Sequence, residues 1–163
     1  MSDTDAEDKL AGFLAKFTPE ISALATSAVA TMRARLPGAT VMVYDNYNAL
    51  AVGFGPNERA SQAVLSIAVF HRGVALCLIR GVGLPDPHKI LKGGGNQVRN
   101  VTLDTAERLD DPRVVDIIDA ALRASSTPIP SAGGRLIVKS ISVKQRPRRP
   151  PLIPAGSAPR RRR

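Results

Sequence analysis

Apolar residues recur at helical spacing in two stretches of the chain. The first stretch follows Thr18 and Pro19, which suit the N-cap and the first position of a helix. Its apolar positions return every three or four residues, at Ile21, Leu24, Ala25, Ala28, Val29, Met32 and Leu36. The second stretch has Asp111 as its N-cap and Pro112 at its first position, and its apolar face is Val115, Ile118, Ala121 and Leu122. This spacing predicts two amphipathic helices, with a shorter helical segment at residues 10–17 before the first.

Between these helices the pattern changes to short apolar stretches separated by turn residues. These stretches span residues 40–47, 49–55, 63–70, 73–80 and 97–103. After the second helix, residues 135–144 are a sixth strand candidate, expected at a sheet edge. Short connections favour antiparallel pairing of successive strands. The order therefore predicts an α+β fold: a twisted antiparallel sheet of five to six strands, with N- and C-terminal helices packed on one face.

The length of 163 residues suits one domain and a tail. We assign residues 8–144 to the domain, with residues 135–144 as its extra edge strand. Residues 1–7 are acidic and residues 145–163 are rich in proline and arginine, so both segments are predicted to be disordered. A single cysteine, an acidic start and apolar runs far shorter than a membrane span favour a cytoplasmic protein without a membrane partner.

The charge is divided unevenly along the chain. Residues 1–125 have a balance of −1, whereas residues 126–163 have a balance of +10, which together give the net charge of +9. The C-terminal segment therefore predicts non-specific binding of nucleic acid or another polyanion. The residues that would carry it are Lys144, Arg146, Arg148, Arg149, Arg160, Arg161, Arg162 and Arg163. A solubilising extension without a dedicated partner is the alternative.

Three consecutive glycines, Gly93, Gly94 and Gly95, raise the question of a phosphate-binding loop. A P-loop needs a Lys-Ser/Thr pair and a following helix, and here Asn96, Gln97 and a predicted strand follow instead. The dinucleotide-binding pattern also fails, because Val98 occupies the place of its third glycine. The glycines are therefore interpreted as a turn that needs a positive φ. Nearby cations leave a small-anion site as a hypothesis, with Arg80, Lys89, Lys92, the three glycines and Arg99 as its residues.

Catalytic and metal-binding patterns are not evident. His71, His88 and Cys77 have no ligand spacing, and Cys77 is expected to be a small buried residue. Acidic residues cluster at residues 3–8 and 104–111, where a solvated terminus and helix-cap chemistry explain them. We therefore predict no catalytic residue, no metal site and no cofactor, and favour a binding protein over an enzyme. An enzyme with a cryptic site stays open.

The order of motifs resembles the YdhG-like family, a domain of unknown function, over residues 8–125. The resemblance rests on "FLAKFTPEISALATSAVATMRARLPGA", the "YDNY" segment, "LIRGVGLPDPHKILKGGGNQVRNVTL" and "DDPRVVDIIDAAL". The family turn more often has a lysine where Asn96 stands, and "YDNYN" lacks the family's proline. The resemblance implies an α/β sandwich without established enzymatic activity. One branch of the family is described as a frataxin-like iron chaperone.

Three hypotheses about function follow. The first is a non-enzymatic cytoplasmic module that binds a small anionic ligand or a protein partner. The second is frataxin-like iron binding, although residues 9–36, taken as the first helical region, hold Glu20 as their only acid. The third is nucleic-acid or polyanion association through the C-terminal segment. The ligand and the oligomeric state are left open.

Overall fold

The computed structural model describes residues 3–151. Within them the helices are α1 (Asp3–Leu14), α2 (Pro19–Arg35) and α3 (Pro112–Ala124). The strands are β1 (Thr40–Asp45), β2 (Leu50–Gly55), β3 (Leu65–Phe70), β4 (Gly73–Leu78), β5 (Arg99–Leu103) and β6 (Arg135–Ile141). Three short 3-10 helices complete the order: η1 (Ala60–Gln62), η2 (Gly81–Gly83) and η3 (Ala106–Asp110). The predicted α+β class is confirmed.

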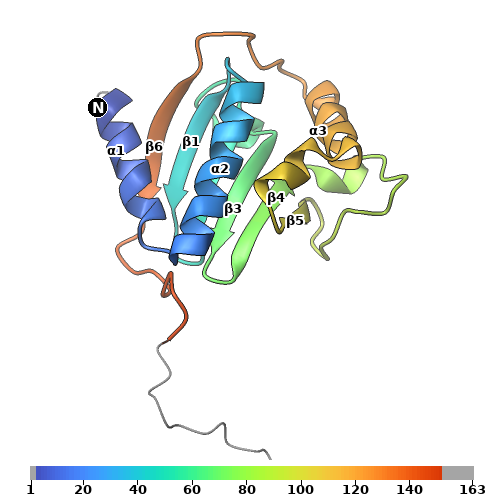
Figure 1. The fold of residues 1–163 in the computed structure, drawn as a ribbon. Coiled ribbons are helices and arrows are strands. Elements are labelled where there is room, and N and C mark those ends of the chain that lie inside the picture. The colour runs from blue at the N-terminus through green and yellow to red at the C-terminus, as the bar shows by residue number, and fades with distance from the viewer. Residues whose placement is uncertain (1–2, 152–163) are drawn as a thin grey trace, which may run out of the picture.

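The strands form one sheet in the order β5-β4-β3-β2-β1-β6. Strands β1 to β4 pair antiparallel with their sequence neighbours, as their short connections predict. Strand β5 also pairs antiparallel with β4, although residues 79–98 separate the two strands in the chain. The sixth strand lies at a sheet edge, as expected, but it pairs with β1 in parallel. The reason is visible in Figure 1: after α3 the chain crosses over the top of the molecule and enters the far edge of the sheet in the direction of β1. The sheet is therefore mixed.

All three helices lie on one face of the sheet (Figure 1). The core between the two layers combines Met32 of α2 and Ile117 of α3 with strand residues such as Phe54 and Leu76, all nearly or fully buried. Strand β4 shows the alternation that creates this core, because Val74, Leu76 and Leu78 are buried. Cys77 is only half-buried.

The two predicted helix starts are confirmed, and their chemistry differs. Thr18 precedes Pro19 without a side-chain capping bond. Asp111 instead accepts a hydrogen bond from the backbone N–H of Arg113 at 3.0 Å. The guanidinium of Arg113 also donates to this carboxylate, and these bonds lower the pKa of Asp111 to about 2. Asp111 is therefore a helix cap, as predicted, and fully ionised at neutral pH.

Both predicted disordered ends require correction. Helix α1 already begins at Asp3, and Ala6 is buried in the core, so residues 3–7 belong to the folded domain. At the other end, residues 142–151 continue from β6 and lie against the domain, where Arg148 is buried. The prediction of a disordered segment is therefore wrong for residues 145–151. Arg160, Arg161, Arg162 and Arg163 lie outside the described residues.

Candidate anion-binding site

A long loop, residues 79–98, joins β4 to β5 and carries most of the residues predicted to bind an anion. Its conformation is fixed from within. The carboxylate of Asp86 accepts hydrogen bonds from the backbone N–H groups of Ile90 and Leu91, each at 3.0 Å. Leu84, Ile90 and Leu91 pack against the hydrophobic core. The loop is therefore an ordered surface element, of a length that in compact domains usually accompanies function.

The glycine turn feeds directly into β5. Lys92 pairs with Asn100 through two backbone hydrogen bonds of 2.9 and 2.8 Å, and the turn closes between them. Gly93 has a φ of 126°, which confirms the predicted need for glycine at this position. Gly94 and Gly95 adopt no such angle and a β-carbon on either would meet open space. Because a strand and not a helix follows the turn, the turn lacks the helix N-terminus with which a P-loop binds phosphate.

Arg99 closes this turn and does not point to a shared cationic site. Its Nη1 donates to the backbone oxygens of Gly95 and Val98, at 2.5 and 2.9 Å. Gly81 packs so closely that a β-carbon there would lie 2.5 Å from the β-carbon of Arg99. The guanidinium of Arg99 thus has a structural partner within the loop.

Arg80 stands at the other end of the loop and lines two hollows. The first, of about 260 Å³, is lined by Arg80, Val82, Gly83, Asn96 and Gln97; we call it the Arg80 hollow. The second is a small pocket of about 30 Å³ among Ala63, Val64, Leu84, Ala121, Ala124 and Ser125. The Nη2 of Arg80 donates to the backbone oxygen of Ser61 at 2.6 Å, which fixes the side chain and leaves its other N–H groups available.

The structure therefore brings only part of the predicted site together. Arg80 meets the residues that follow the glycine turn, whereas Lys89 and Lys92 are exposed and line neither hollow. Asn96 and Gln97 were missed as site residues, although they stand directly after the three glycines. Their amides and the guanidinium supply hydrogen-bond donors, and no carboxylate from the described part of the chain lines the hollow. Such a set suits a carboxylate or phosphate group.

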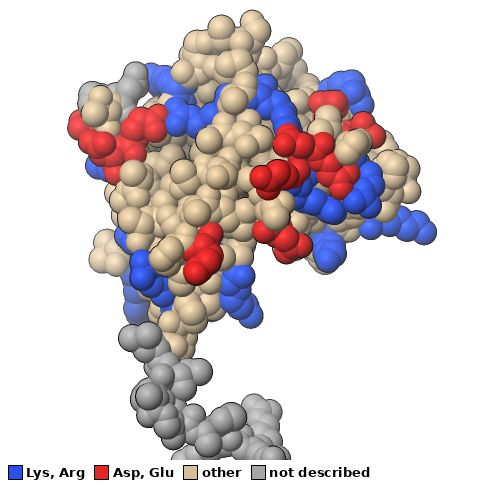
Figure 2. Space-filling view, viewed as in Figure 1, with Lys and Arg blue, Asp and Glu red and all other residues tan. Residues whose placement is uncertain are grey.

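Metal-binding groups are not assembled in the described part of the chain. No cluster of three or more His, Cys, Asp or Glu side chains there could hold a metal ion. The acids of residues 3–8 do lie on the first helix, contrary to the expectation that the first helical region holds only Glu20. Figure 2 shows acidic side chains gathered over α1 and around η3 and α3. Glu7 of α1, however, forms an ion pair with Arg33 at 2.6 Å.

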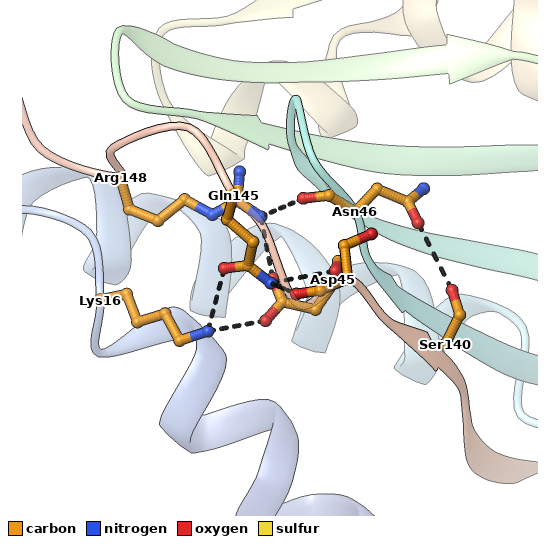
Figure 3. A network of polar contacts seen from close by, with 7 residues as sticks. Lys16, Asp45, Asn46, Ser140, Gln145 and Arg148 are labelled. Carbon is orange, nitrogen blue, oxygen red and sulfur yellow. Dashed lines mark hydrogen bonds and ion pairs between the residues drawn. The ribbon is translucent and has the colours of Figure 1, made fainter.

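A buried carboxylate organises the segment after β6, residues 142–151, which we call the C-terminal strap. Asp45 is fully buried at the end of β1. Its two carboxylate oxygens accept hydrogen bonds from Arg148 at 2.9 Å and from Lys16 at 2.7 Å, and Gln145 donates to its backbone oxygen at 3.1 Å (Figure 3). Burial alone would raise the pKa of Asp45, but the hydrogen bonds from Lys16, Gln145 and Arg148 outweigh burial and lower it.

These contacts change the interpretation of the predicted polyanion-binding residues. Arg148 is buried inside the domain, where its charge neutralises the carboxylate of Asp45. The prediction that Arg148 binds polyanions at the surface is therefore wrong. Arg149 is exposed and donates from Nε to the backbone oxygen of Lys16 at 3.1 Å. Arg146 lies over the ring of Tyr47, 5.6 Å from its centre, and Lys144 is exposed. The strap is therefore held to the domain by the buried Arg148, and its outer side carries exposed cations.

No protein-family model, no curated protein and no solved structure matches the chain. The resemblance to the YdhG-like family therefore stays a prediction. In the described residues, no helix has both the length and the apolar character needed to cross a membrane.

Proposed function

We propose that the protein is a non-enzymatic binding module that holds a small anionic ligand in the Arg80 hollow. The observation that carries the proposal is the meeting of Arg80 with Asn96 and Gln97, at the two ends of one ordered loop. The ligand class is a small molecule with a carboxylate or phosphate group. A cytoplasmic location is part of the proposal and rests on the single cysteine.

Electrostatics support an anion at this position. Asp86 is the loop's only acid, and its carboxylate is occupied by two backbone N–H groups. Hydrogen bonds between a charged donor and a charged acceptor contribute about 1.5–3 kcal/mol each. At about 260 Å³ the hollow is slightly smaller than a typical drug-sized site, so it suits a small metabolite or one anionic group of a larger one.

The non-enzymatic part of the proposal rests on the state of the nucleophilic and basic groups. Burial raises the pKa of the Cys77 thiol, against a smaller opposite effect of its hydrogen bond with Ser66, which disfavours the reactive thiolate. His71 and His88 make no hydrogen bond or ion pair with the described residues. The YdhG-like resemblance implies the same absence of established enzymatic activity.

Isothermal titration of the full chain with sodium phosphate and with citrate, at low ionic strength, tests this proposal. Arg80→Gln should weaken binding by about tenfold or more, since a charged hydrogen bond is lost. Arg72→Gln is the matched control, because Arg72 is also exposed but lies in the β3–β4 turn. Equal affinity in wild type and Arg80→Gln, or no binding of either probe by the wild type, would refute the proposal.

A further inference from the structure

Three apolar side chains are exposed where the strap meets the β1–β2 turn. Tyr47 is 45% exposed, Ile141 49% and Val143 fully exposed. Two backbone hydrogen bonds of 2.8 Å, from Ser142 to Asp45 and from Arg146 to Tyr47, hold the strap beside the turn. The three apolar residues therefore lie in adjoining segments at this end of the molecule.

Cationic side chains accompany these apolar residues. Residues 139–163 contain no acid. Asp45, at the end of β1, is fully buried and paired with Lys16 and Arg148, so it does not offset the outer charges. Lys144 is exposed, and the guanidinium of Arg146 lies over the ring of Tyr47. We call Tyr47, Ile141, Val143, Lys144 and Arg146 together the strap surface.

We propose that the strap surface binds single-stranded nucleic acid. Its composition is that of a stacking platform: an aromatic ring with an arginine upon it, aliphatic neighbours and cations for the phosphates. A duplex would present mainly phosphates and would leave Tyr47, Ile141 and Val143 against a charged backbone. Unpaired bases instead offer apolar faces to these side chains.

A lipid surface fits the same residues less well. Peripheral membrane binding needs apolar area that enters the bilayer in addition to the attraction of cations to anionic lipids. Here that area comes from three side chains, and a guanidinium lies over the largest of them. The strap surface also differs from the simpler expectation of a basic tail, because the binding residues lie on the folded domain. Arg148 is excluded from it, since it is buried on Asp45.

Fluorescence anisotropy with a labelled single-stranded uridine 20-mer and a mixed-sequence 20-base-pair DNA duplex tests the proposal. The wild type should prefer the single strand. Tyr47→Ala should weaken single-strand binding by about tenfold, the usual contribution of one stacked base. Replacing Lys144 and Arg146 by glutamine should reduce the salt-dependence slope by about 1.4, or about 0.7 for each charge. Arg123→Gln is the control and should leave binding unchanged, because Arg123 is an exposed arginine of α3 and not part of the strap surface.

A chain that ends at Pro151 separates the strap surface from Arg160–Arg163. This variant should bind more weakly and with a smaller salt slope, yet keep its single-strand preference and its sensitivity to Tyr47→Ala. Thermal unfolding of each variant shows that the fold is intact. The proposal is overturned if the shortened chain no longer binds, if Tyr47→Ala has no effect, or if the protein binds phosphatidylserine vesicles but not the single strand.

Discussion

Asp45 shows how one residue can connect distant parts of the chain. Asp45 is the last residue of the apolar strand β1. From the sequence, an aspartate before Asn46 indicates only a turn, but the side chain of Asp45 is fully buried. Its carboxylate contacts Lys16, after α1, and Arg148, in the strap. A buried charge is tolerated only when its partners are in place, and here the partners come from two segments far from β1 in the sequence.

We expect Asp45→Asn to lower the free energy of unfolding by about 3 kcal/mol, the usual cost of breaking a buried ion pair. The loss should be large because the Nε of Arg148 is already buried without a hydrogen-bond partner among residues 3–151, and the substitution would also remove the charged acceptor of the guanidinium. Urea unfolding measures the change. Asp110→Asn is the control: Asp110 pairs with Arg35 but is 64% exposed, so it should cost less than about 1 kcal/mol. Equal costs would contradict this account.

The lowered pKa of Asp45 also predicts how stability depends on pH. Its folded value lies below the ordinary 3.8, so near pH 4 the unfolded chain binds more protons than the folded one. Stability from Asp45 is therefore complete above about pH 5 and is lost as the pH falls through the folded pKa. Urea unfolding at a series of pH values measures this. The difference in the free energy of unfolding between wild type and Asp45→Asn should be constant from pH 7 to 5 and should decrease below pH 4. A gap that widens on acidification would disprove the assignment.

At the scale of elements, the loop of residues 79–98 shows which features of a loop the local sequence can predict and which it cannot. Three glycines before a β-branched stretch predicted a turn into a strand, and that is what they form. The sequence does not show which glycine carries the unusual angle, because that depends on where Lys92 and Asn100 pair. The sequence also suggested that all the nearby cations share one site. In the structure Arg99 donates to a backbone oxygen of its own loop, and Lys89 and Lys92 are exposed and line neither hollow.

Gly93→Ala should destabilise the protein by about 1–2 kcal/mol, because alanine at a φ of 126° is strained. Gly94→Ala is a matched control, since Gly94 has no such angle and open space around it, and its cost should stay within about 0.5 kcal/mol. Thermal and urea unfolding of the two variants decide the point. Indistinguishable stabilities would mean that the turn imposes no requirement for glycine at position 93.

The strap gives a second prediction at this scale. A chain that ends at Lys144 lacks Gln145 and Arg148 and should lose about as much stability as Asp45→Asn, whereas a chain that ends at Pro151 should keep the wild-type value. Combining the shorter truncation with Asp45→Asn should cost far less than the sum of the two changes, because both act on one network. Additive losses in urea unfolding would show that the strap does not act through Asp45.

At the scale of the whole molecule, the place of β5 depends on the loop of residues 79–98, whereas the fold class and the order of strands β1 to β4 could be predicted because short connections decide them locally. The parallel pairing of β6 could not, since it depends on the path of residues 125–134 over the top of the domain. The same limit applies to the ends of the chain. Composition predicted disorder from residue 145, but the contacts of Arg148 with a carboxylate over a hundred positions away override it.

The candidate site was predictable only in part for the same reason. Arg80 and the glycine turn were both identified from sequence, but of these only Arg80 lines the hollow, together with Asn96 and Gln97, which follow the turn. The donors Asn96 and Gln97 were missed because an amide after a glycine run has no distinctive pattern. Their importance follows from the fold of the loop, which carries them back to Arg80.

Backbone amide NMR during a titration with inorganic phosphate can locate the anion site residue by residue. If the Arg80 hollow is the anion site, the largest shift changes should fall on Val82, Gly83, Asn96 and Gln97, and they should disappear in Arg80→Gln. Changes centred on Gly94 and Gly95 that persist in Arg80→Gln, or changes spread evenly over the exposed lysines and arginines, would contradict it.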